Sequence, residues 1–464
     1  MQKPYWARLN QIDLSRCIAF TMRSHSRDIS TDTDEELDAL LEREHNTDLK
    51  AHYGELPFWR LAVLHEEGTL QQFVVSFVFH HGIADTMSGL AFHRSFLDAL
   101  LRAHNDKRDG DKARASTPCL VQPPNTPLLP PLETVHTLPL SWRFIFRELK
   151  SALFSSPKPG SWTGHPVPTS FENQRSRLRS FSLLSNVTNQ THAACQKHKV
   201  TITSPLQVLI TNALFVAIPQ KYTVLSVEGA ISFRRSLQSD RITQDSIGCY
   251  VGGYRETHRR DTATDVPWPE ARRVRRNIEV ELAKDGKDTL VAMSRFIFNY
   301  TSFFNSMRGR PRESSLEFSN VGRFVSVNQP EKSDSARWSI SKIVFSHNAD
   351  VTGAAVLCSA VTGEDGKLSL GFAWAEGGVD EGIIQKLMEG TRNSWNVLFV
   401  PRRDVGPFYK GTASKSSATS VKPVTDKKQA IDAELELLSK IEARCMFSLR
   451  SSWIEQHRNY SPRQ

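Results

Sequence analysis

The stretch Phe73–Phe92, FVVSFVFHHGIADTMSGLAF, is the most informative part of this sequence. Its first half is β-branched and aromatic, which predicts a strand that ends at two histidines, His80 and His81. Apolar residues at helical spacing follow Asp85, so the second half predicts a helix. Because both faces of the strand are apolar, we expect a central strand that is covered on both sides.

The second histidine of this stretch is a candidate general base. A neutral imidazole accepts a proton near pH 7, and a strand end fixes its position better than a loop does. Successive strand side chains point to opposite faces, which directs His80 away from His81. For His80 we therefore favour an ordinary strand role over support of the base. For Asp85, two roles are open at this point: a carboxylate that braces the site, or an ordinary helix cap.

The spacing of these residues resembles a known signature. His81-x-x-x-Asp85-x-x-Ser88-x-x-x-Phe92 is similar to the His-x-x-x-Asp-Gly-x-Ser-x-x-x-Phe motif of the acyl-CoA-dependent acyltransferase superfamily. That superfamily includes chloramphenicol acetyltransferase, the plant BAHD enzymes, peptide-synthetase condensation domains and the fungal alcohol acetyltransferases. Thr86 stands where the motif has glycine, and the plant Asp-Phe-Gly-Trp-Gly motif is absent from the sequence. The doubled histidine is more similar to condensation domains and fungal alcohol acetyltransferases.

Four further segments resemble the same family in the same order, over roughly residues 5–400. They are Ser161-Trp-Thr-Gly164, Ala230-Ile-Ser-Phe-Arg234-Arg-Ser-Leu237, Ile247-Gly-Cys-Tyr-Val-Gly252 with Cys249 in place of asparagine, and Ser319-Asn320-Val-Gly322. The resemblance implies that Arg234 pairs with Asp85. An oxyanion needs a hydrogen-bond donor, for which Ser319, Asn320 and the Gly322 amide are the candidates.

The resemblance implies a two-lobed α/β fold similar to chloramphenicol acetyltransferase, with mixed sheets, helices and an active site at the lobe interface. We place the first lobe at residues 1–160, the second at 161–405, and a flexible tether with a terminal helix at 406–464. The implied reaction is acyl transfer, most simply of acetyl, from acyl-CoA to a hydroxyl or amine, with His81 as base. Acetyl-CoA or another acyl-CoA would be the co-substrate, with no permanently bound cofactor, and a small-molecule alcohol or amine the acceptor.

Two other functions are open. One is a relative that has lost catalysis and only binds a small hydrophobic ligand, which Thr86 favours. The other is a condensation-type enzyme that takes its acyl group from a carrier protein. We expect no carrier domain in this chain, which weakens that alternative.

The composition is typical of a soluble globular protein, and the chain is long enough to form the hydrophobic cores of two or three domains. The chain has 464 residues, of which 39% are hydrophobic and 23% charged. Its net charge of +9 suits a phosphate-bearing substrate such as CoA, although a basic solvated surface explains the charge more simply. No nucleic-acid-binding motif occurs, so we expect no nucleic-acid partner.

The six cysteines are scattered and form no Cys-x-x-Cys pair, so we expect neither a metal site nor a disulfide framework. They are Cys17, Cys119, Cys195, Cys249, Cys358 and Cys445. The start of the chain has no apolar signal core, and no run of 18 apolar residues occurs. We therefore expect a cytoplasmic protein. We also expect a monomer, and peripheral contact with a membrane or lipid surface is left open.

Hydrophobic periodicity predicts the remaining elements. The expected strands span 57–64, 72–81, 179–184, 224–233, 338–348, 354–362 and 367–374, and the expected helices 32–42, 138–154, 203–218, 268–284, 379–398 and 428–447. Residues 105–131 read as a polar, Pro-rich linker and 409–427 as a flexible tether. For the apolar and basic helix at 138–154, we favour packing between the lobes over contact with a membrane surface.

Overall fold

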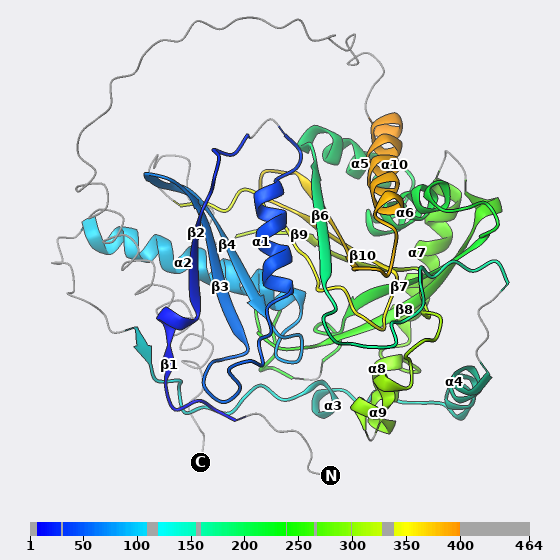
Figure 1. Cartoon of the computed structure of the whole chain (residues 1–464), viewed down its shortest axis with the longest axis horizontal. Coiled ribbons are helices and arrows are strands. Elements are labelled where there is room, and N and C mark those ends of the chain that lie inside the picture. The colour runs from blue at the N-terminus through cyan, green and yellow to red at the C-terminus, as the bar shows by residue number, and fades with distance from the viewer. Residues whose placement is uncertain are drawn as a thin grey trace, which may run out of the picture.

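The structure consists of two α/β lobes that follow one another along the chain (Figure 1). It is a computed structural model that describes residues 7–28, 31–108, 119–154, 159–237, 239–263, 267–297, 299–326 and 338–399. A three-stranded sheet in the first lobe uses residues 18–79, and a six-stranded sheet in the second uses residues 176–375. The predicted α/β class is therefore confirmed. The predicted division at residue 160 falls between the two sets of strands.

The sheet of the first lobe has the order β2 (Ile18–Met22), β3 (Trp59–Glu66), β4 (Thr69–Phe79). β2 and β3 are parallel, whereas β3 and β4, which lie at the strands expected for 57–64 and 72–81, form an antiparallel pair. The helices of this lobe are α1 (Glu35–His45) and α2 (Thr86–Arg108). α1 begins after Asp34, whose carboxylate accepts a hydrogen bond from the Leu37 amide, as N-cap residues do.

β4 is an edge strand of the described sheet, so the prediction that it is central is wrong. The predicted cover on both faces is present, because Phe77 packs in the cluster that includes Phe92 of α2, and Val74 packs against Leu40 of α1. Among the described residues its ladder partner is β3, and its side chains line a cavity where a further strand was expected. On one face Phe77 stacks on Phe92 of α2, with ring centroids 4.0 Å apart. An apolar pattern on both faces predicts that both faces are packed, but it does not show whether a further strand pairs along the edge, because backbone pairing selects no particular side chains.

The sheet of the second lobe has the order β6 (Ser176–Leu183), β11 (Leu368–Ala375), β10 (Val356–Thr362), β9 (Leu316–Arg323), β7 (Val224–Ser232), β8 (Val251–Arg259). Its main helices are α5 (Ser185–Lys197), α6 (Thr203–Ala217), α7 (Trp268–Ala283) and α10 (Glu381–Phe399). The fully buried side chains of Leu206 and Leu214 on α6 pack in one core with Phe318, Phe372 and Trp395. The elements predicted in this lobe are present within a few residues, except at 338–348, whereas α5, β8 and β9 were not predicted.

Residues 338–348 form no strand, contrary to the prediction. Their apolar side chains are used differently: Ile343 packs with Leu90 of α2, and Val344 packs against Leu40 of α1. This segment of the chain, which precedes β10, therefore inserts into the first lobe. Its apolar pattern reflects contacts with helices instead of a strand ladder.

α4 (Trp142–Phe154) forms the predicted helix, but the expected packing between the lobes is wrong. Trp142, Phe146 and Leu149 are 85%, 72% and 51% exposed. Figure 1 shows the helix at the rim of the second lobe, where Glu148 lies 3.8 Å from Arg255 of the edge strand β8 (Val251–Arg259). Phe144 is buried on the opposite side of the helix and anchors it to the protein.

The remaining elements are short. They are β1 (Ile12–Asp13), which pairs with β5 (Leu120–Val121), and the helices α3 (Leu132–Val135), α8 (Leu290–Met293) and α9 (Tyr300–Asn305). Among the described residues, no helix combines the length and apolar character needed to cross a bilayer. The tether expected at 409–427 and the helix expected at 428–447 lie outside the described residues.

A buried ion pair joins the two lobes. Asp85 directly precedes α2, Arg234 follows β7, and the two residues are 5% and 4% exposed. The guanidinium donates from Nη1 to Asp85 Oδ2 at 2.6 Å and from Nη2 to Oδ1 at 2.8 Å. A charge buried this deeply is stable only while its partner is present.

Loss of either partner should destabilise the protein. For Asp85→Ala and for Arg234→Ala we expect a fall of about 3–5 kcal/mol in the free energy of unfolding, because each leaves a buried charge unpaired. Denaturant unfolding of both single variants and of the double variant measures the coupling. The double variant should lose clearly less than the sum of the two single losses.

The exposed ion pair between Arg16 and Glu55, whose side chains are 46% and 63% exposed, provides the matched control. Arg16→Ala and Glu55→Ala should each change the free energy of unfolding by about 0–1 kcal/mol. Fully additive losses at Asp85 and Arg234 would show that the two residues do not stabilise one another.

Candidate active site

The two histidines of the sequence motif line a cavity of about 1580 Å³. One wall is β4, from Phe73 to Phe79, and the facing wall is the segment 338–349. α1 and α2 contribute further side chains, among them His45 and His93. The cavity therefore lies between the strand that positions the motif and the segment that enters from the second lobe.

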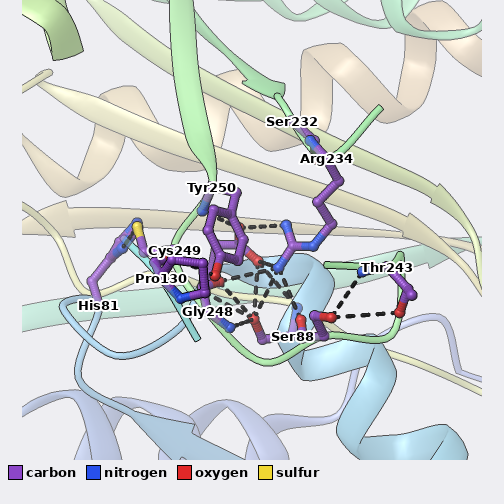
Figure 2. A network of polar contacts seen from close by, with 11 residues as sticks. His81, Ser88, Pro130, Ser232, Arg234, Thr243, Gly248, Cys249 and Tyr250 are labelled. Atoms are coloured by element: carbon purple, nitrogen blue, oxygen red, sulfur yellow. Dashed lines mark hydrogen bonds and ion pairs between the residues drawn. The ribbon is translucent and has the colours of Figure 1, made fainter. Parts of the chain in front are cut away.

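His81 lies where side chains of both lobes meet. Its Nδ1 is 3.6 Å from the Sγ of Cys249, and Figure 2 shows the two side chains directed toward each other. On another side its ring is nearly parallel to that of His347, at 9° and a centroid distance of 6.5 Å. The end of β4 supplies the backbone support for His81, and the second lobe supplies two neighbours for its side chain.

The thiol of Cys249 is a neutral neighbour of the imidazole. Burial, with a smaller contribution from the charge of Asp85, raises the pKa of Cys249 to about 11. At neutral pH the group is therefore a thiol, which is a weak hydrogen-bond donor and not a nucleophilic thiolate.

Both carboxylate oxygens of Asp85 are used to brace the structure. Besides Arg234, Oδ1 accepts from the Ser88 amide and hydroxyl at 3.1 Å each, and Oδ2 accepts from the Tyr250 amide at 3.0 Å. Arg234 Nη2 also donates to the carbonyl oxygen of Gly248 at 3.1 Å (Figure 2). Although Asp85 is also among the residues that line the cavity, these bonds engage both of its oxygens, and it thereby fixes the 248–250 loop that carries Cys249.

Thr86, which departs from the glycine of the resembling motif, has an ordinary backbone. It is the first residue of α2, and it is not among the described residues with a positive φ. Glycine is required only where φ is positive or a backbone approaches closely. The position therefore accepts threonine without strain.

His80 has different neighbours from His81. Its Nδ1 accepts a hydrogen bond from the Gly82 amide at 3.0 Å, and its ring packs against Phe58 at 5.6 Å. Burial lowers the pKa of His80, and the charges of Lys50 and His81 lower it further. Although both rings line the cavity, only His81 faces Cys249 and His347.

The candidate oxyanion donors on β9 are only partly suited to that role. Asn320 Nδ2 donates to Thr203 Oγ1 at 3.1 Å, and Asn320 Oδ1 accepts from the Gly322 amide at 3.0 Å. These contacts occupy both Asn320 and Gly322, and neither residue lines the cavity. Ser319 is buried beside Ser359 in the β9–β10 ladder, on the face of the sheet opposite the Phe318 core.

His347 and Ser359 were missed by the sequence analysis. His347 lines the cavity, and its Nδ1 is 3.3 Å from the hydroxyl of Ser359 on β10. No local signal marks His347, because it follows an apolar run that was predicted to be a plain strand. Only its position beside His81 in space distinguishes it. Among the described residues, no group of His, Cys, Asp and Glu could hold a metal ion.

Sequence comparison matches this chain to one protein family, and structural comparison matches it to a protein with the same fold. The alcohol acetyltransferase family profile matches residues 5–389. A probable alcohol acetyltransferase of Aspergillus fumigatus is 33% identical over 402 residues, which are 83% of each chain. One of Fusarium pseudograminearum is 23% identical over 71% of this chain and 69% of that protein. A solved structure of a trichothecene 15-O-acetyltransferase from Fusarium sporotrichioides shares the fold, with a TM-score of 0.51 and 14% identity; the match covers 83% of this chain and 77% of that chain. The chain therefore belongs to the alcohol acetyltransferase family and is an acyltransferase of that type.

Proposed function

We propose that this protein transfers an acyl group, most simply acetyl, from acyl-CoA to the hydroxyl or amine of a small molecule, with His81 as general base. The proposal rests on the different surroundings of two residues of the motif. His81 lines the cavity between the lobes, while Asp85 is committed to Arg234. A base that faces a cavity, on a loop braced by a buried ion pair, is the arrangement that general-base catalysis needs.

The proposed reaction transfers the acyl group in one attack. His81 takes the proton of the acceptor while the acceptor oxygen or nitrogen bonds to the thioester carbonyl carbon. The tetrahedral oxyanion then collapses, the carbon–sulfur bond breaks, and the departing thiolate takes the proton back from His81. The raised pKa of Cys249 supports direct transfer, because a neutral thiol is a poor nucleophile.

The lining of the cavity supports a substrate pair with one anionic and one apolar partner. Lys50, Lys342 and Lys367 are among its residues and would attract the phosphates of CoA. The aromatic side chains of Phe73 and Trp338 would contact the body of an apolar acceptor. No permanently bound cofactor is needed for this chemistry.

Two alternatives predict different results with the same reagents. A protein that only binds a hydrophobic ligand would release no thiol from acyl-CoA with any acceptor. A condensation-type enzyme would transfer an acyl group from a carrier protein but not from CoA. Incubation with acetyl-CoA and a panel of alcohols and amines, with thiol release as the readout, separates these from the proposed enzyme.

Replacement of the base should remove activity and leave the fold intact. His81→Ala should lower the transfer rate by about 10²–10⁴, the usual contribution of a general base. His80→Ala is the matched control: the neighbouring imidazole faces Phe58 and the Gly82 amide, so its loss should cost much less. Near-normal turnover in folded His81→Ala would exclude His81 as the base. Equal losses in both variants would contradict the separation of the two roles.

The C-terminal residues should be dispensable for the chemistry. A chain that stops at Val405 keeps α10 and the whole described site. We expect it to release thiol from acetyl-CoA at a rate close to that of the full chain. A soluble, folded truncation without activity would show that the removed residues help to build the active site.

We also propose that α4 contacts an anionic lipid surface. Trp142, Phe146 and Leu149 repeat at helical spacing and are exposed, and Arg143 and Arg147 repeat at the same spacing beside them. Exposed aromatic residues next to cations are typical of helices that lie in a membrane interface. Each basic residue near such a surface adds roughly 1 kcal/mol of attraction.

Sedimentation with lipid vesicles tests this contact. The full chain should bind phosphatidylcholine vesicles that contain phosphatidylserine, and W142S/F146S should lose that binding without loss of transfer. V216S/V397S, which removes two other residues that are 83% and 78% exposed, is the matched control. Equal binding by W142S/F146S would exclude α4 as the lipid contact, and a dimer that this variant abolishes would assign the surface to a second copy of the chain.

A further inference from the structure

We propose that His347 is a second catalytic residue, which donates a hydrogen bond from Nε2–H to the oxyanion that forms when the acceptor attacks the thioester. This inference rests on the proposed function and extends it. Ser359 is assigned a positioning role, because its hydroxyl engages Nδ1 of the same ring. The donor candidates on β9 are less suited to this role: Asn320 and the Gly322 amide are engaged with Thr203 and with each other, and neither they nor Ser319 line the cavity.

The position of His347 is fixed by its surroundings. Its ring packs edge-on against Phe345, at 4.4 Å and 79°, and Nδ1 lies 3.3 Å from the Ser359 hydroxyl. Ser359 is 2% exposed and belongs to β10, in the centre of the second sheet. A catalytic donor must be held in place before the reaction, and these two contacts hold the ring.

His347 and His81 face the same reaction volume from different lobes. Both line the cavity, and their nearly parallel rings are 6.5 Å apart between centroids. A substrate carbonyl that reacts beside the ring of His81 is therefore close enough to accept a hydrogen bond from a ring nitrogen of His347. Among the described residues, no hydrogen-bond partner is present for His347 Nε2, so this nitrogen is available to a ligand.

The two imidazoles differ in protonation chemistry. Burial, with smaller contributions from the charges of His81 and His45, lowers the pKa of His347 to about 3. His347 is therefore neutral at any working pH, is a poor base and carries one ring N–H. If the Ser359 hydroxyl donates to Nδ1, the proton must be on Nε2. A neutral imidazole N–H in this setting can polarise a carbonyl oxygen.

Three variants at this pair test the assignment. His347→Leu removes the donor and should lower kcat by about 10²–10³, as loss of one oxyanion donor does, with little change in KM for acetyl-CoA. His347→Gln places an amide N–H near the former Nε2 and should recover much of that loss. Ser359→Ala removes the group that orders the tautomer, and we expect a smaller fall in kcat with an unchanged melting temperature.

His192 provides the control. It lies on α5, it does not line the cavity, and burial lowers its pKa as well. His192→Gln should leave kcat within about threefold of the unchanged protein. The pH dependence of kcat should keep its midpoint in the His347 variants, since His347 does not titrate in the working range.

The outcomes separate this inference from the proposed function. Thiol release by the unchanged protein and its loss in His81→Ala establish the function, and their absence would remove both proposals. With that activity present, a folded His347→Leu with nearly full kcat overturns the inference. The inference is also overturned if the kcat of His347→Gln is no higher than that of His347→Leu, because His347 would then have a packing role. A shifted midpoint in the pH dependence of kcat overturns it too, because His347 would then act through its charge. If His347→Leu does not fold, the kcat and the pH midpoint of His347→Gln and Ser359→Ala test the inference instead.

Discussion

The buried ion pair between Asp85 and Arg234 is the constraint on which the site depends. Asp85 lies between the strand and the helix of the first lobe, and Arg234 lies at the end of a strand of the second. Removing both charges from water is costly, so the pair is stable only when the lobes are correctly placed and the remaining hydrogen bonds are made. The Ser88 and Tyr250 amides and the Gly248 carbonyl oxygen supply those bonds. One interaction thereby sets both the distance between the lobes and the path of the loop that carries Cys249.

This constraint divides the chemistry among the side chains. Because both carboxylate oxygens of Asp85 accept hydrogen bonds from Arg234, Ser88 and Tyr250, we assign the proposed proton transfer to His81. The environments of the imidazoles then differ. His81 sits at the junction of the lobes, whereas burial keeps His347 neutral. Two residues of the same type can therefore have opposite roles, one that accepts a proton and one that only donates a hydrogen bond.

Local patterns predicted much of the fold, and the errors have physical causes. The strand–histidine–helix unit, the two strands β3 and β4 and the apolar helix α6 follow from periodicity within short windows. The edge position of β4 was not predictable, because the cores on its two faces select apolar residues whether or not a further strand pairs along its edge. Exposure of Trp142 on α4 was missed for the same reason: an apolar stripe does not reveal what covers it. The motif resemblance suggested Asp85 and Arg234 as partners, although 149 positions separate them. His347 lies in no recognisable motif, and only the packing of its segment between the lobes brings it to His81.

The central claim is that His81 activates the acceptor directly, without an acyl group on the protein. The serious alternative uses the thiol of Cys249, 3.6 Å from His81, as a nucleophile. Mass spectrometry of the intact protein, mixed rapidly with acetyl-CoA before any acceptor is added, tests this most directly. The account predicts an unmodified protein at all times, and a Cys249→Ser variant that still transfers acetyl when an acceptor is present. An acetyl group on Cys249 that forms and is discharged to the acceptor at the rate of turnover would contradict it.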